Sequence, residues 1–165
     1  TVHHTYTFAN AVRALSARTD VPELYRGVLD AALSVYRDRF LNTPPVPLPD
    51  PAGDRDPDAV LPALLETFEV EADEEVSRAG RLAAEYLASG GDVDRLLRED
   101  VGFHAGQNLE AAFAGYDAAS DAARGRVHLV ATARYLAAHT PTRRAGEQTF
   151  RIAERLSRGE RIHEA

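Results

Sequence analysis

The sequence predicts an all-α fold, a compact bundle-like domain of about seven helices with a proline-rich extended linker between the second and third helices. Apolar residues recur at helical spacing along most segments, and no stretch alternates apolar and polar residues as a half-buried strand does. Connections are short apart from residues 43–57, which favours neighbouring helices that pack together. With 165 residues, of which 44% are hydrophobic, the chain fits one domain spanning residues 1–165.

The first two helices precede the proline-rich segment. The first is expected over about residues 2–18, and an N-cap at Asp20 begins the second, which runs to about Leu41. The inward stripe of the first helix consists of Phe8, Val12 and Leu15, with His4 one turn before Phe8. Six prolines between residues 44 and 57 favour an extended polyproline II linker. A two-helix hairpin of about 40 residues cannot bury its own core, so it must dock on the helices beyond the linker.

The third and fourth helices flank an acidic stretch. Asp56 is a candidate N-cap for the third helix, although Pro62 strains a continuous helix and is the alternative start. This helix should reach about Phe68. The acidic residues 69–75 lead into the fourth helix, because acidic side chains favour the positive end of the helix dipole. Gly90 and its neighbour end it.

Two glycines interrupt the next helix, which is expected to run from a cap at Asp92 to about Tyr116. Gly102 and Gly106 each cost about 1 kcal/mol relative to Ala in an exposed helix interior. Close approach of a neighbouring helix or a ligand explains such glycines, and a kink is the alternative. Two further helices are expected over about residues 120–139 and from Thr140-Pro141 to about Gly159.

Composition excludes several function classes. The chain has no cysteine, which removes disulfides and cysteine-ligated metals. A net charge of -7 opposes nucleic-acid binding, which needs excess positive charge. No apolar run approaches the roughly 18 residues of a membrane span, and no export signal is visible, so we expect a soluble, cytoplasmic domain. The absence of methionine, together with a helical pattern that starts at the first residues, suggests a piece of a longer chain.

Histidines are the most notable candidate ligands, since the chain has six of them. Helical spacing puts His4 on an inward stripe and His104 and His128 at the borders of apolar faces. Each buried imidazole needs a partner, so we predict that these three line one cavity as metal ligands. Gln107 lies on the same helical surface as His104, and Tyr135 lies on the same surface as His128. Both are therefore candidate cofactor-binding residues. For any single histidine, the alternative is a satisfied core or surface residue.

The other histidines are expected to lie outside this cavity. His3 points about 100° away from its neighbour and is expected to be exposed. His139 lies about 16 Å along the helix from His128, where it should bond near the following turn. His163 belongs to a short polar tail and should be solvated.

Several phrases resemble a helical region of bacterial proteins associated with a Rieske-type iron-sulfur domain, and more widely questin-oxidase-like proteins. They are residues 4–11 (HTYTFANA), residues 35–42 (VYRDRFLN), Phe103-His104 and residues 134–142 (RYLAAHTPT).

The resemblance implies an oxidoreductase context. It matches His4, His104, His128 and His139 to recurrent family histidines, and Gln107 to a neighbouring polar position. A Rieske cluster needs two cysteines, and this chain has none, so any such cluster would lie outside these residues.

Two functions of different classes remain open. The first is a histidine-lined site between helices of a monooxygenase-like oxidoreductase, which binds iron or an organic substrate. The second is a noncatalytic helical module that docks an iron-sulfur or other cofactor-bearing domain, or another subunit, with a homo-oligomer as one possibility. Metal analysis of the purified domain distinguishes them.

Overall fold

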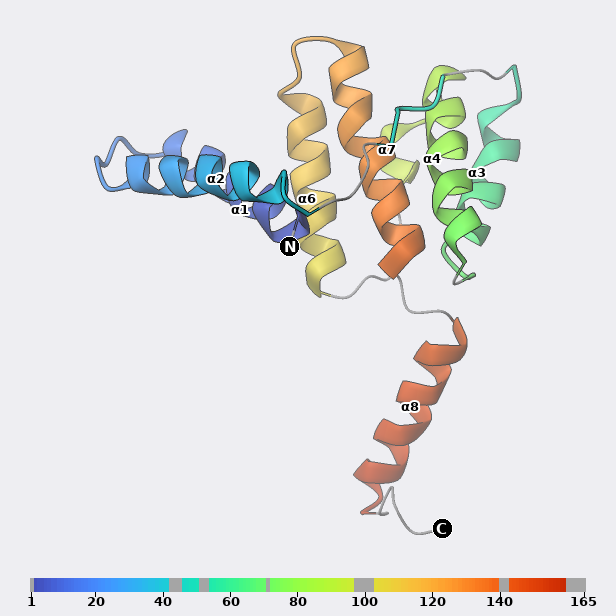
Figure 1. The fold of residues 1–165 in the computed structure, drawn as a ribbon. Coiled ribbons are helices and arrows are strands. Elements are labelled where there is room, and N and C mark those ends of the chain that lie inside the picture. The colour runs from blue at the N-terminus through green and yellow to red at the C-terminus, as the bar shows by residue number, and fades with distance from the viewer. Residues whose placement is uncertain are drawn as a thin grey trace.

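The computed structural model describes residues 2–41, 46–50, 54–70, 72–96, 103–139 and 143–159, which contain eight helices and no strand (Figure 1). The predicted all-α bundle is therefore confirmed. The helices are α1 (Val2–Ser16), α2 (Leu24–Asp38), α3 (Pro57–Glu66), α4 (Asp73–Ala88), α5 (Val93–Leu96), α6 (Phe103–Asp117), α7 (Ala122–His139) and α8 (Arg143–Ser157). None of the described helices is long and apolar enough to cross a membrane.

The hydrophobic core lies between α3, α4, α6 and α7, with Leu96 of α5 added to it. Both α4 and α7 bury alanines, whose small side chains let two helices approach closely. The largest side chains with essentially no exposure are Tyr86, Leu64, Leu96, Leu129 and Leu136. This four-helix body is the platform on which the remaining elements are placed.

Helix boundaries follow the predicted capping residues in the body of the chain. The Asp56 carboxylate accepts a hydrogen bond from the Asp58 N–H at 3.0 Å, and Asp92 does the same for Asp94. Gly90 ends α4 with a φ of +79°, a conformation that glycine adopts at little cost. These three local signals are confirmed.

One predicted boundary is wrong, and one alternative start is not used. Pro62 does not start α3 but lies inside it, where it cannot donate the helical hydrogen bond to the carbonyl four positions earlier. Asp20 does not cap α2. The helix begins at Leu24, four residues after Asp20, and its N-cap, Glu23, makes no side-chain hydrogen bond. The turn that contains Pro22 separates Asp20 from the first helical residue.

The proline-rich linker crosses the surface of the body where it is described. Residues 46–50 have no helical structure, and the Arg134 guanidinium on α7 donates a hydrogen bond to the Pro47 carbonyl at 3.0 Å. Residues 42–45 and 51–53 lie outside the described residues. Figure 1 shows this segment passing near α7 and α4 before the chain reaches α3.

The α1–α2 hairpin docks on the body through α6, as the size argument predicts, and projects sideways from it (Figure 1). The Asn10 amide donates a hydrogen bond to Glu110 at 2.7 Å, while Val12 packs against Gly27 of α2. The predicted inward stripe is wrong in part, since Phe8 and Leu15 are exposed. The face of α1 that meets α6 carries polar residues, which the apolar pattern could not identify.

Two further features depart from a uniformly packed bundle. Helix α8 stands away from the other helices in Figure 1, and its Phe150 is 71% exposed. Gly106 faces open space, so no close approach explains it. Gly102, Leu97 and Val101, which were expected on the same helix, lie outside the described residues.

A candidate metal site and its cavity

Three histidines gather where α1 and α6 begin. His3 and His4 lie in the first turn of α1, and His104 is the second residue of α6. Their ring centroids are 5.0 Å apart for His3 and His4, 5.4 Å for His3 and His104, and 5.1 Å for His4 and His104. One nitrogen from each ring lies within 4.8 Å of the others. The three imidazoles therefore offer one donor set from two helices.

His3 is the most constrained of the three. Both of its ring nitrogens are buried and have no hydrogen-bond partner among the described residues. Burial lowers the pKa of His3 below its usual value, and the neighbouring His4 and His104 lower it further because they repel a second positive charge. The ring is therefore neutral at pH 7, the form that binds metal ions.

An aromatic stack continues from His3 onto the end of α7. The Tyr135 ring lies 4.8 Å from His3 on one side and 4.4 Å from His139 on the other, and both pairs are nearly parallel. His139 Nδ1 is also 3.1 Å from the Tyr135 carbonyl oxygen. The stack holds the His3 ring in place, so Tyr135 acts on the site through packing.

The structure brings together two of the three histidines that the sequence predicts as ligands. His4 and His104 come together as predicted, but His3 completes the group in place of His128. His3 was expected to be exposed, whereas it is partly buried, and His4 was expected inward but is exposed. The face of α1 that meets α7 is set by aromatic stacking on Tyr135, which an apolar pattern does not report. The signal present in the sequence was two adjacent histidines in the first turn of a helix.

The remaining predicted residues divide between the cavity and the surface. His139 was expected apart from the cavity, yet it lines the same cavity as His3, because α1 lies over the end of α7. Tyr135 also lines the cavity. Gln107 is exposed one turn after His104 and is not among the lining residues. His163 lies outside the described residues.

His128 forms a second polar group, with Tyr6 of α1. The Tyr6 hydroxyl lies 2.9 Å from His128 Nδ1, and the rings are stacked. Burial, with the charge of Glu110, raises the pKa of Tyr6 to about 12, so Tyr6 keeps its proton at neutral pH. Burial also lowers the pKa of His128. Both groups are therefore uncharged at pH 7.

Gly115 of α6 makes room for the His128 ring, and no pattern in the sequence identified it. A Cβ at this position would lie 2.5 Å from His128 Nδ1. A contact this short forces the ring to move, so glycine here fixes the ring position. It is the close-approach glycine of α6, in place of Gly106.

One cavity joins the two histidine groups. It has a volume of about 670 Å³ and lies between α1, α6 and α7. Its walls include His3, Tyr135 and His139 near one end, Tyr6 and His128 near the other, and several apolar side chains. The volume falls within the range of about 300–1,000 Å³ typical of small-molecule pockets. An organic molecule of moderate size fits beside the histidine group.

Comparison with protein-family models, with curated proteins and with solved structures found no match to this chain. The assignment of this site therefore depends on its geometry.

The His128 pair predicts acid sensitivity. Because the folded-state pKa of His128 lies below its unfolded value near 6.5, the unfolded chain binds a proton more readily. We expect the free energy of unfolding to be constant above about pH 7 and to fall as pH drops from about 6.5 towards the folded pKa. Urea unfolding at pH 7.5 and pH 5.0 measures this loss. A His128→Asn variant should lose less stability over the same interval, and an equal loss would contradict the assignment.

Proposed function

We propose that this chain binds one first-row transition-metal ion through His3, His4 and His104, as the substrate-facing helical domain of an oxidoreductase. The observation that carries the proposal is the three-imidazole group in which His3 has two buried nitrogens without a partner among the described residues. A buried nitrogen that lacks a partner is costly, and a metal ion would satisfy one of them. Satisfied core histidines, the alternative for a single residue, do not leave both nitrogens unpaired.

Neutral imidazoles suit iron, zinc and copper. A tetrahedral ion with bonds of about 2.0–2.1 Å needs donor atoms about 3.4 Å apart. The three ring nitrogens lie within 4.8 Å of one another, so binding would draw them closer together. His4 and His104 are exposed, which gives the ion a path from solvent.

Three protein ligands leave at least one coordination position open, as in catalytic metal sites. A bound iron would supply redox or Lewis-acid chemistry beside the cavity, while the chain holds the substrate against its apolar walls. Tyr6 and His128 would offer hydrogen bonds at the far end of the same cavity. The resemblance to questin-oxidase-like proteins agrees with this arrangement, and any Rieske cluster would belong to residues outside this chain.

Metal titration tests the proposal directly. We expect calorimetry with Zn²⁺, and with Fe²⁺ in the absence of oxygen, to give one ion per chain at pH 8. The affinity should fall at pH 5.5, because the ligands must lose their protons before they bind. If neither ion binds at millimolar concentration, or if the affinity does not change with pH, the histidine site is refuted.

The noncatalytic alternative is supported by a different observation. Helix α2 leaves a broad apolar face exposed, which includes Tyr25, Leu29 and Val35. An exposed apolar patch often marks an interaction surface. A chain that stays folded and binds no metal, yet associates with a cofactor-bearing domain, would favour this function over the metal site.

A further inference from the structure

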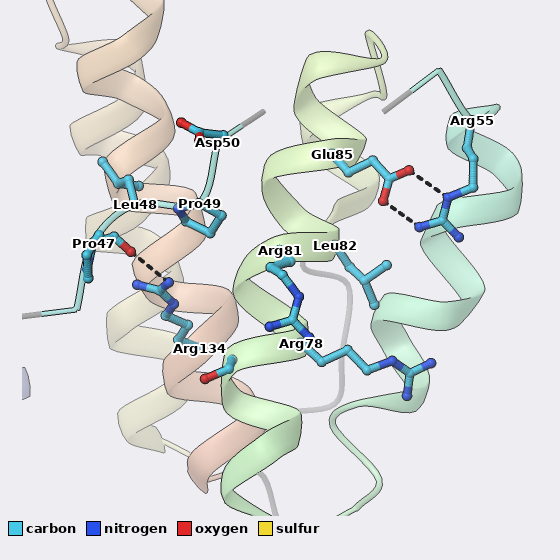
Figure 2. A pocket seen from close by; sticks show the side chains of 11 residues that line it. Pro47, Leu48, Pro49, Asp50, Arg55, Arg78, Arg81, Leu82, Glu85 and Arg134 are labelled. Carbon is cyan, nitrogen blue, oxygen red and sulfur yellow. Dashed lines mark hydrogen bonds and ion pairs between the residues drawn. The ribbon is translucent and has the colours of Figure 1, made fainter. Parts of the chain in front are cut away.

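A second cavity, on a different face of α7 from the histidines, is lined by four arginines. It has a volume of about 560 Å³ and lies between α4, α7 and linker residues 46–50 (Figure 2). The arginines are Arg55, Arg78, Arg81 and Arg134. Although the net charge of the chain is -7, positive charge is concentrated around this cavity.

Two of the four arginines are neutralised by acidic partners. Arg55 pairs with both carboxylate oxygens of Glu85, through Nε at 2.6 Å and through a second nitrogen. Arg78 pairs with Glu75 at 3.0 Å and with Glu66 at 3.5 Å. Figure 2 shows the Arg55 pair on the α3 side of the cavity.

Arg81 and Arg134 have no such partner. Neither forms an ion pair within the part of the chain that the structure describes, although Asp50 lies at the cavity wall. The two guanidinium groups therefore contribute positive charge to the same space, which the Asp50 carboxylate at the wall offsets only in part. Figure 2 shows them on facing helices, α4 and α7.

The position of Arg134 is fixed by its surroundings. Its side chain crosses Gly80 of α4, where an added Cβ would collide with Nε and lie 3.0 Å from Cγ. The Pro47 carbonyl accepts a hydrogen bond from the same guanidinium. Its Nε is buried without an acceptor among the described residues.

The positions of Arg81 and Arg134 are electrostatically unfavourable when no ligand is bound. Burial lowers the pKa of Arg134, and the charge of Arg81 adds to the effect. Two like charges that face one cavity without an ion-pair partner among the described residues repel one another, whereas a bound anion would turn this cost into attraction.

We propose that Arg81 and Arg134 bind the phosphate group of a small phosphate monoester, with its organic part against Leu48 and Leu82. Guanidinium groups match phosphate oxygens with paired, charge-assisted hydrogen bonds. A phosphate monoester carries nearly two negative charges above pH 7, so it attracts two guanidinium groups more strongly than a singly charged anion does. Apolar side chains of the cavity wall, Leu48 from the linker and Leu82 from α4, can cover the organic group.

Calorimetry with phenyl phosphate at pH 8 and low salt tests this site. We expect binding at millimolar or lower concentration, and a loss of about tenfold or more in both Arg81→Gln and Arg134→Gln. Arg81 is exposed, so its replacement should leave the fold intact even if Arg134→Gln does not. Arg124→Gln, at the start of α7 and paired with Asp121, is the matched control and should bind as the native chain does.

Other probes separate this site from general charge effects. Benzoate, which has the same ring and one negative charge, should bind more weakly than phenyl phosphate, and equal binding would overturn the assignment to a phosphate dianion. No binding of phenyl phosphate, or binding that Arg81→Gln does not change, would overturn the site itself. Prior loading with Zn²⁺ should not change the affinity, since the histidines lie elsewhere.

Discussion

Replacing Tyr86 with alanine should lower the free energy of unfolding by about 3–5 kcal/mol, the range seen when a large aromatic side chain is deleted from a core. Tyr86 lies in α4 with 0% exposure and is among the largest fully buried side chains. Its ring packs directly against Gly91, where an added Cβ would collide with it. Its hydroxyl donates a hydrogen bond to the Asp92 carbonyl at 3.0 Å. The deletion therefore leaves a cavity and removes the hydrogen bond between α4 and the turn before α5.

Two variants divide this effect into its parts. Tyr86→Phe keeps the ring and loses only the hydrogen bond, so it should cost about 0.5–1.5 kcal/mol. Tyr25→Ala, on the exposed face of α2, should change stability by no more than about 0.5 kcal/mol. Urea unfolding followed by circular dichroism gives all three values. A loss below about 1 kcal/mol in Tyr86→Ala would mean that this part of the core is not packed as described.

The fold was largely predictable because its signals are local. Asp56 followed by Pro57 and the glycine at position 90 act through one or two backbone groups, and each is found where the sequence predicts it. The repeated apolar spacing of α4 and α7 likewise reports burial along each helix by itself. Such features need no knowledge of which helix lies opposite.

The site was only partly predictable because it depends on pairs of helices. The face that α1 presents to its neighbours is set by Asn10 on Glu110 and by His3 on Tyr135, and neither contact follows an apolar pattern. The ring of His128 needs Gly115, thirteen residues away on another helix. His4 and His104 were predicted as ligands, His4 from the inward stripe of its helix and His104 from the border of another stripe. The choice between His3 and His128 required the positions of α1 and α7.

Metal affinity should distinguish the three histidines that lie together in the structure from the three predicted by the sequence. The two sets share His4 and His104 and differ in His3 and His128. We expect His3→Ala and His104→Ala each to weaken Zn²⁺ binding by at least about 100-fold, since loss of even an outer partner of a metal ligand costs about 10–100-fold. His128→Ala should retain the native affinity within a few fold, because His128 bonds to Tyr6 and does not belong to the three-histidine group.

Thermal unfolding provides a second readout of the same comparison. An ion that binds only the folded chain stabilises it by about 2.7 kcal/mol when present at 100 times its dissociation constant. Native protein and His128→Ala should therefore melt at a higher temperature with Zn²⁺ than without it, and His104→Ala should not. The melting temperature of each variant without metal, measured beside the shift with Zn²⁺, separates a lost ligand from a damaged fold. Equal loss of affinity in His128→Ala and His104→Ala would instead favour a site that includes His128, and would require α1 to move along α7 when the ion binds.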